Sequence, residues 1–482
     1  MKKKDWTDSV MDIFAEICKI PRPSGHEEKI GEFLVNFAKE RGLAYKTDKV
    51  GNVLICKPAS AGMENRQTVI LQAHQDMVCE KDATLTFDFM RQPIQTYIED
   101  GWLKAKGTTL GADDGMGIAM ALAIIDSDEI AHGPIECLFT VSEETGLCGA
   151  ENLQPGMMNG SMLINLDSED EGEIFIGCAG GVNTTITFDF SHEAVPAGHF
   201  FLKLSVHKLH GGHSGDDIDK GYANANKVMA RFLFSIIDKY DVRLCSFCGG
   251  NLHNAIPRDA TAIIAVPNSC KEDIRVDFNI FADTIQKEFH VTETEMEFRM
   301  ESADVQPYCI ENTVARNFIS SLHGVINGVY AMSMDVPGLV ETSSNLASVR
   351  TEENTIRLIA SHRSSVESCK WNIASTVAAT FRLAGAKVVH GEGYPGWMPN
   401  TESRLLAIAV EKYKELFNQS PKVRAIHAGL ECGLFLTSYP NLDMISVGPT
   451  LRGVHSPAER LELCTVNMVF QHLVAILEAI PE

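Results

Sequence analysis

The chain carries two patterns of apolar and polar positions. Up to about residue 185, short apolar runs such as residues 68–71 and 135–141 alternate with segments of helical periodicity, which is typical of α/β folds with buried strands. Along residues 184–190 and 200–206, apolar and polar residues alternate, which is typical of an antiparallel sheet with one exposed face. We therefore predict an α/β mixed-sheet domain sandwiched by helices, with an inserted α+β domain.

The insertion has its own helices and a glycine-rich end. Helical patterns at residues 223–240 and 370–384 each adjoin strand patterns, which predicts two ferredoxin-like sheet-plus-helix units. Residues 391–397, with three glycines and a proline, have the composition of a hinge. The predicted domains are residues 1–185 and 393–482, which form one domain in two segments, and the inserted residues 186–392.

The first forty residues predict two helices. Apolar residues between Trp6 and Ile17 recur at helical spacing, and acidic residues interrupt them, so we expect an amphipathic helix and no signal peptide. Ser24 and Glu27 have the spacing of a capping box, which predicts that a second helix opens there and reaches Ala38.

Charge and cysteine content restrict the partners and the compartment. With 42 Lys and Arg against 64 Asp and Glu, the net charge of −22 disfavours nucleic acids and anionic membranes as partners. Apolar runs such as residues 118–125 are too short to span a bilayer. The thirteen cysteines lack the dense spacing of a secreted disulfide scaffold and are expected to be reduced thiols. We therefore expect a cytoplasmic protein.

Polar side chains follow the predicted buried strands at the points where these end. The strand-exit residues are His74, Asp76, Glu143, Glu144 and Asp167. Because the carboxyl ends of strands in an open α/β sheet form the ligand-binding edge, we expect these side chains to lie close together.

Two further segments add candidates to this edge. The glycine-rich loop at residues 107–115 places Asp113 and Asp114 at the start of an apolar helix, and His455 follows a strand pattern at residues 444–447. Imidazoles with carboxylates suit zinc, with manganese and cobalt as alternatives. Adjacent residues at a strand end point in opposite directions, so one of Glu143 and Glu144 can bind metal while the other acts as a base.

Eight short strings, in order and along essentially the whole length, resemble the M20-type metallopeptidases, most closely their aminoacyl-histidine dipeptidase branch. The strings are residues 74–78 (HQDMV), 108–115 (TTLGADDG), 142–146 (SEETG), 165–169 (NLDSE), 211–215 (GGHSG), 254–258 (NAIPR), 427–433 (HAGLECG) and 453–457 (GVHSP). The resemblance implies two divalent metal ions per chain, most simply Zn²⁺, with Mn²⁺ or Co²⁺ as alternatives.

The resemblance also implies roles for the first domain. Asp113 would bridge the two metals, and a cis peptide would follow it; Asp114 stands where relatives often have Asn. The ligands completing the sites would be Glu144 and His455 for one metal, and His74 and Asp167 for the other. Asp76 would orient His74, and Glu143 would be the general base.

The inserted domain would then be a lid that supplies substrate contacts. The resemblance implies that His213 donates to the carbonyl oxygen of the substrate and that Asn254 is a further donor. Arg363 is a candidate clamp for the substrate carboxylate, because guanidinium binds carboxylate bidentately. In the loop at residues 425–433, backbone amides near Gly429 could receive the carboxylate, and Glu431 could meet the ammonium or anchor the loop.

The expected function is hydrolysis of unblocked dipeptides, of the Xaa-His type such as carnosine, entering between the two domains. The alternatives are an N-acyl amino acid deacylase with the same core and a non-catalytic metal- or peptide-binding module. The presence of Glu143 argues against the binding module, because such a protein needs no positioned base. Association of two copies into a homodimer through an exposed lid edge is left open.

Overall fold

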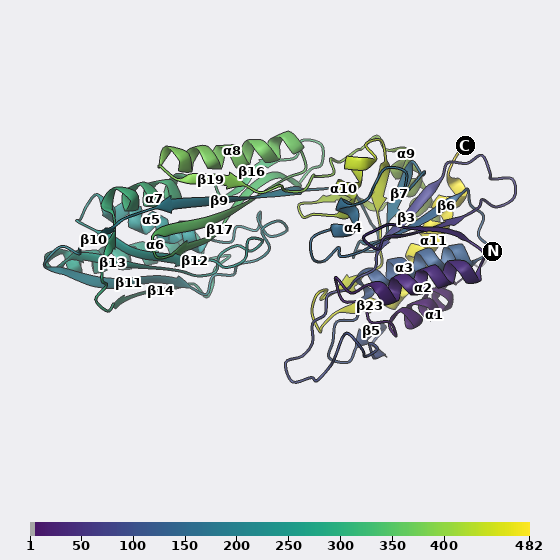
Figure 1. The fold of residues 1–482 in the computed structure, drawn as a ribbon, viewed down its shortest axis with the longest axis horizontal. Helices are drawn as coiled ribbons and strands as arrows, with labels where there is room; N and C mark the ends of the chain where they lie inside the picture. Colours follow the sequence, from purple (N-terminus) through teal and green to yellow (C-terminus); the bar gives the residue numbers. More distant parts are fainter. Residues whose placement is uncertain (1–4) are drawn as a thin grey trace. The chain divides into compact units, whose positions relative to one another are not determined.

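The structure, a computed structural model, describes residues 5–482 and divides into two compact units (Figure 1). Unit 1 combines the chain up to Cys178 with Trp397–Ala425 and Leu430–Glu482, and unit 2 consists of Ala179–Gly396 and Ile426–Gly429. The predicted boundary at residue 185 falls within strand β9 (Gly180–Asp189), which belongs entirely to unit 2. Unit 2 also includes residues 426–429, which are the last residue of β20 and the loop after it, and Ala179 N donates there to the carbonyls of Ile426 and Ala428.

Unit 1 is built on an eight-stranded mixed sheet with the order β1-β2-β6-β3-β7-β21-β8-β20. The central pairs β6–β3, β3–β7 and β7–β21 are parallel, whereas β1–β2, β2–β6 and β21–β8 are antiparallel. The strands are β1 (Ala44–Thr47), β2 (Val53–Lys57), β3 (Val69–His74), β6 (Ile135–Thr140), β7 (Met162–Asn165), β8 (Glu173–Cys178), β20 (Lys422–Ile426) and β21 (Asp443–Ser446).

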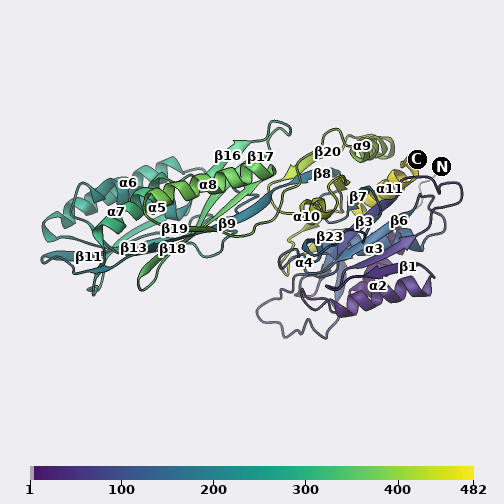
Figure 2. The same ribbon diagram turned by 45° about the horizontal axis from the view of Figure 1, so that its top comes forward.

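Helices cover both faces of this sheet. Leu71 and Ala73 of β3 enter the main hydrophobic core, where α3 packs beside β3 and β6 (Figure 2). Gln72 points to the other face, because side chains alternate along a strand, and donates to Glu431 in α10. The helices that contribute to this core are α1 (Thr7–Ile17), α2 (Glu28–Glu40), α3 (Ala112–Asp126), α9 (Arg404–Phe417) and α11 (Leu463–Ala479). Two shorter helices, α4 (Cys148–Glu151) and α10 (Glu431–Ser438), contact each other.

The predicted capping box at Ser24 was wrong. Helix α2 begins at Glu28, and Glu27 occupies the N-cap position without a side-chain cap bond. Ser24 Oγ donates instead to Asp76 Oδ2 at 2.7 Å, and Glu27 Oε1 accepts from Ser142 N at 3.0 Å. Both side chains therefore hold loops at the carboxyl edge of the sheet rather than the end of a helix.

A second sheet of unit 1 has four strands in the order β22-β23-β5-β4. Its strands are β4 (Thr96–Glu99), β5 (Trp102–Ala105), β22 (Leu451–Arg452) and β23 (Arg460–Glu462). The loop between β22 and β23 carries His455, so this sheet places a residue from near the end of the chain.

Unit 2 contains the two predicted ferredoxin-like units, one nested in the other. The inner unit has the chain order β11-α5-β12-β13-α6-β14, and its strands lie in the sheet in the order β14-β11-β13-β12. The outer unit has the chain order β9-α7-β17-β18-α8-β19, and its strands lie in the order β19-β9-β18-β17. The inner unit is inserted into the outer one between β9 and α7. Pairing of β12 with β17 joins them into one nine-stranded sheet that also includes β16. The further strands are β11 (His199–His207), β12 (Arg243–Gly249), β13 (Ala260–Pro267), β14 (Glu297–Ser302), β16 (Gly328–Met332), β17 (Val340–Thr351), β18 (Thr355–Ser364) and β19 (Lys387–His390), with a separate pair β10 (His192–Glu193) and β15 (Cys309–Ile310).

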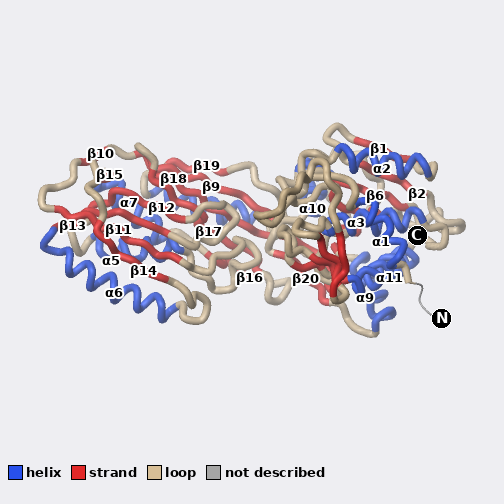
Figure 3. Tube along the Cα trace, turned by 90° about the horizontal axis from the view of Figure 1, so that it is seen from below, coloured by secondary structure: helices blue, strands red, loops and turns tan. Residues whose placement is uncertain are grey.

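Helices of unit 2 bury one face of this sheet in a second hydrophobic core. Helices α5, α7 and α8 lie on that face (Figure 1), and Figure 3 shows the strands from the other side. The helices are α5 (Ala225–Ile237), α6 (Lys271–Glu288), α7 (Asn312–Gly324) and α8 (Glu367–Leu383). In neither unit, across residues 5–482, does a helix have both the length and the apolar content needed to cross a bilayer.

Candidate metal centre

Parallel strands bring the predicted residues to one edge of the unit 1 sheet. His74 is the last residue of β3, and its register partner Thr140 is the last residue of β6. The turn at Ser142–Glu144 follows β6, and Asp167 follows β7. Residues from distant parts of the sequence therefore meet because neighbouring parallel strands end together.

Asp113 lies between two histidines and directs one carboxylate oxygen to each. Its Oδ1 is 3.0 Å from His74 Nε2, and its Oδ2 is 3.1 Å from His455 Nε2. Asp167 Oδ1 lies 3.4 Å from the same nitrogen of His74, and Glu144 Oε1 lies 2.9 Å from that of His455. The peptide after Asp113 is cis, as the resemblance implied. One carboxylate thus joins two imidazole–carboxylate pairs.

The donor atoms of this group fit divalent cations. Ligand atoms of His74, Asp113 and Glu144 lie within 4.8 Å of one another, as do those of His74, Asp114 and Asp167. Glu144 Oε1 is buried, and the imidazole of His455 lies 2.9 Å from it. Buried carboxylate oxygens gathered around imidazole nitrogens are the ligand set that a borderline divalent metal prefers. We call these six residues the acidic cluster: His74, Asp113, Asp114, Glu144, Asp167 and His455.

The electrostatics show an excess of negative charge. Burial raises the pKa of Asp167 well above its usual range, and neighbouring carboxylates add to the effect. Hydrogen bonds to Asp113 and then Glu144 raise the pKa of His455 to about 11. Burial alone would lower the pKa of His74, but its acidic neighbours outweigh burial and raise it well above the ordinary value. The cluster therefore requires positive charge, which metal ions would supply.

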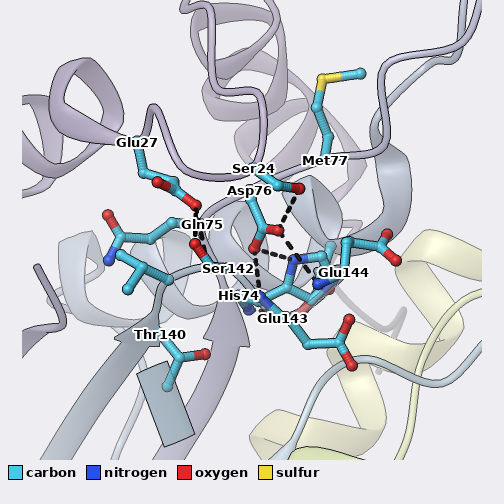
Figure 4. A network of polar contacts seen from close by, with 12 residues as sticks. Ser24, Glu27, His74, Gln75, Asp76, Met77, Thr140, Ser142, Glu143 and Glu144 are labelled. Atoms are coloured by element: carbon cyan, nitrogen blue, oxygen red, sulfur yellow. Dashed lines mark hydrogen bonds and ion pairs between the residues drawn. The ribbon is translucent and has the colours of Figure 1, made fainter. Parts of the chain in front are cut away.

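Asp76 connects the histidine to the glutamate turn (Figure 4). Its Oδ1 lies 3.3 Å from His74 Nδ1 and accepts from Glu143 N at 3.0 Å, and its Oδ2 accepts from Glu144 N at 3.3 Å and from Ser24 Oγ. Burial opposes ionisation, but His74 and the other donors lower the pKa of Asp76 to about 2. This ionised, fully buried carboxylate therefore fixes both the imidazole and the backbone of the turn.

The two glutamates of the turn extend away from Asp76 (Figure 4). Ser142, which precedes them, has a φ of 52°, in the left-handed region, and Asn52 Oδ1 accepts from Val141 N just before it. Burial, together with nearby carboxylates, raises the pKa of Glu143 well above its usual range.

Asp114 points its oxygens at the backbone. Its Oδ2 accepts from His74 N at 3.3 Å, and its Oδ1 accepts from Gly117 N at 3.0 Å. Asp114 therefore ties the start of α3 to the end of β3.

Glu431 is fully buried at the start of α10. Its Oε2 accepts from Gln72 Nε2 and from Thr140 Oγ1, each at 2.7 Å. Burial raises its pKa to about 7. These contacts are those of an anchor for the loop, which is one of the two predicted roles.

Unit 2 gathers a second group of polar side chains around Arg363, in β18. Arg363 Nη2 lies 3.3 Å from His213 Nε2, and its Nη1 donates to Tyr394 Oη at 3.1 Å. His427 lies near Arg363, and burial together with that charge lowers its pKa to about 4. We call these four residues the basic cluster: His213, Arg363, Tyr394 and His427.

The other predicted residues of unit 2 adjoin this cluster through the backbone. The Asn254 carbonyl accepts from Ser214 N at 2.8 Å, and the Asn254 side chain is exposed. A Cβ added at Gly429 would lie 3.0 Å from Tyr394 Cε2, so the glycine allows the close approach of the ring. The structure thus brings His213, Arg363 and Gly429 together.

Several residues of these sites were not predicted. Tyr394 lies in the segment identified only as a hinge, and Ser24 was assigned to a helix cap. Arg22 and Glu459 are charged residues without a motif, and both are buried against the ligand loops. The only available signal was for Glu459, a charged residue that lies two positions after the string at residues 453–457.

Comparisons with known proteins bear on the family of this chain. Residues 70–479 match the peptidase family M20/M25/M40. The chain is 43% identical over 470 residues to the cytosol non-specific dipeptidase of Escherichia coli (strain K12), covering 98% of this chain and 97% of that protein. The crystal structure of aminoacylhistidine dipeptidase from Vibrio alginolyticus matches with a TM-score of 0.92 and 43% identity, over 98% of this chain and 97% of that one.

A more distant structure shares the fold. Aminopeptidase PepT from Bacillus cereus is 16% identical with a TM-score of 0.57, over 98% of both chains. The family match covers most of the chain, and the Escherichia coli relative extends over nearly all of it. The chain therefore belongs to the peptidase family M20/M25/M40.

Proposed function

We propose that this protein is a dinuclear metallo-dipeptidase. The observation that carries the proposal is the position of Asp113, whose two oxygens face His74 with Asp167 on one side and His455 with Glu144 on the other. A pair of divalent ions bound there would polarise the scissile carbonyl and acidify a water molecule. Imidazole and carboxylate ligands favour zinc, with manganese or cobalt as alternatives.

Glu143 is the proposed general base. The hydrogen bond from its backbone N–H to Asp76 fixes the turn, while its side chain extends away from Asp76 (Figure 4). In this role Glu143 takes a proton from the attacking water and delivers it to the leaving amine. Asp76 is the residue that holds His74 and this turn in register.

The basic cluster is the proposed site for the charged and polar groups of the substrate. Arg363 binds the carboxylate of the dipeptide, because guanidinium pairs with carboxylate bidentately. His213 donates to the carbonyl oxygen as it gains negative charge, and Asn254 and the backbone near Gly429 supply further donors. Glu431 anchors the loop that carries Gly429.

The substrate class follows from the relatives. Their names describe a non-specific dipeptidase and an aminoacylhistidine dipeptidase, so we infer unblocked dipeptides, including those with a C-terminal histidine such as carnosine. The name of the Escherichia coli relative also supports a cytosolic location.

A metal-reconstitution assay tests the proposal. Metal-free protein is incubated with Zn²⁺, Mn²⁺ or Co²⁺ and assayed on Gly-His, carnosine, other dipeptides and acetyl-amino acids. We expect no turnover without metal and hydrolysis of dipeptides with it. Turnover of acetyl-amino acids alone would identify a deacylase, and full activity after removal of metal would overturn the metal mechanism.

A further inference from the structure

Glu459 makes an unusual set of contacts for a glutamate without an assigned role. It lies four residues after His455, and its side chain is only 2% exposed. Oε2 accepts from the backbone N–H groups of Leu110 at 2.7 Å and Gly111 at 3.0 Å, and Oε1 accepts from those of Ala112 at 2.8 Å and Asp113 at 3.4 Å. One carboxylate therefore binds four consecutive amides that end at the bridging aspartate.

Arg22 holds the same loop from its carbonyl side. It is 3% exposed, and Nη2 donates to Gly111 O while Nη1 donates to Gln75 O and Asp76 O. The peptide groups of Gly111 are thus bound by both buried charges: its N–H by Glu459 and its carbonyl by Arg22.

Two glycines make room for this arginine. A Cβ at Gly111 would lie 2.8 Å from Arg22 Nη2, and a Cβ at Gly115 would lie 2.7 Å from the same atom. Gly111 also has a φ of +69°, which side chains disfavour. The glycines of the loop therefore allow the guanidinium to approach the backbone closely.

Together the two side chains connect three ligand loops. Arg22 binds the residues directly after His74, Glu459 binds the backbone of Asp113, and Glu459 itself belongs to the loop of His455. Among these contacts, none joins Arg22 or Glu459 to a ligand atom of the acidic cluster. Their bonds instead set the spacing of the loops from which His74, Asp113 and His455 project.

We propose that Glu459 and Arg22 are positioning residues that determine how tightly the protein holds its metal pair. The inference rests on the proposed metal centre. Glu459 joins the Asp113 and His455 loops directly, so its loss weakens the site of Glu144 and His455 more than the site of His74 and Asp167. Outer partners of metal ligands typically change metal affinity by roughly 10- to 100-fold when mutated.

The main test is Glu459→Gln, which keeps the shape but turns one oxygen into an NH₂ group that faces backbone donors. Glu136→Gln is the matched control: Glu136 is also buried in unit 1, and its Oε2 accepts from Asn159 N at 2.8 Å and Gly160 N at 3.0 Å, at the opposite end of β6 from the acidic cluster. Zn²⁺ affinity and stoichiometry are measured on metal-free protein by competition with a chromogenic chelator, beside the melting temperature.

We expect both variants to lower the melting temperature of metal-free protein, and only Glu459→Gln to weaken Zn²⁺ binding, by roughly 10- to 100-fold at one of two sites. Parental Zn²⁺ affinity in Glu459→Gln, or an equal loss in Glu136→Gln, would overturn the proposal. If Glu459→Gln does not fold, Arg22→Lys gives the same test, because a single ammonium cannot reach all three carbonyls, and unchanged affinity there would be equally decisive. Failure of the parent to bind any of Zn²⁺, Mn²⁺ and Co²⁺ would refute the proposed function itself.

Discussion

The acidic cluster of unit 1 and the basic cluster of unit 2 show how surroundings decide what a histidine can do. Hydrogen bonds to Asp113 and Glu144 raise the pKa of His455 to about 11, whereas burial and the charge of Arg363 lower the pKa of His427 to about 4. His455 therefore lies among carboxylates, and His427 is neutral beside a guanidinium. The acidic surroundings suit the proposed metal ions, and the basic surroundings suit the proposed substrate carboxylate.

The clusters also differ in how the fold assembles them. The acidic cluster uses the shared edge of parallel strands, where β3, β6 and β7 end together. The basic cluster forms on an antiparallel sheet, where Arg363 of β18 meets loops that lead into and out of the unit. Metal chemistry is thus proposed for the sheet of unit 1, and recognition of substrate charge for unit 2.

Removal of metal should affect the two clusters most unequally. We expect chelation to abolish turnover and to increase hydrogen exchange at residues 110–113 and 142–144, but not at residues 213–217. At free metal about 1,000 times its Kd, bound metal contributes about 4 kcal/mol of stability. Hydrogen exchange followed by mass spectrometry measures the change in exchange rate at each segment. Equal changes in both units would contradict the comparison.

Glu143→Gln should have the next largest effect. The variant keeps the ligands and the backbone bond to Asp76 but lacks a base, so we expect kcat to fall by roughly 100- to 10,000-fold while both metals are retained. Steady-state kinetics and a metal count by mass spectrometry are the readouts. Glu151→Gln, on the exposed surface of α4, is the control that should leave both unchanged. A near-parental kcat would remove the proposed role of Glu143.

Arg363→Lys tests the anion site. Hydrogen bonds to charged groups contribute about 1.5–3 kcal/mol, and lysine cannot bind carboxylate bidentately, so we expect KM for dipeptides to rise by roughly 10- to 100-fold. Dipeptide amides, which lack the carboxylate, serve as matched substrates and should show no such difference between variant and parent. An equal rise in KM for both substrates would argue against a carboxylate contact.

Tyr394→Phe should have the smallest effect. It removes the hydroxyl that accepts from Arg363 Nη1 but keeps the ring beside Gly429. The hydroxyl acts on the substrate only through Arg363, whose guanidinium remains, so we expect KM to rise by only about 2- to 10-fold, less than for Arg363→Lys, with kcat unchanged. Tyr330→Phe, on exposed β16, is the control. A fall in kcat without a change in KM would show that Tyr394 does not act through carboxylate binding.

Local patterns in the sequence were sufficient for the fold class and for most candidates. Periodicity predicted the mixed sheet with its helices and the two ferredoxin-like units, which the structure confirms. Short strings indicated the peptidase family, which the comparisons confirm. The predicted metal ligands lie together in the acidic cluster, and their roles remain predictions for the experiments above.

Only the tertiary structure decided which charged residues are buried and what they contact. Ser24 and Glu27 match a helix cap in sequence, yet their hydrogen bonds go to Asp76 and Ser142. Arg22 and Glu459 match no motif, because a buried charged side chain that binds backbone amides or carbonyls produces no periodic pattern in the sequence. Spacing along the chain encodes faces and strand ends, whereas long-range hydrogen bonds depend on which loops the folded sheet brings together.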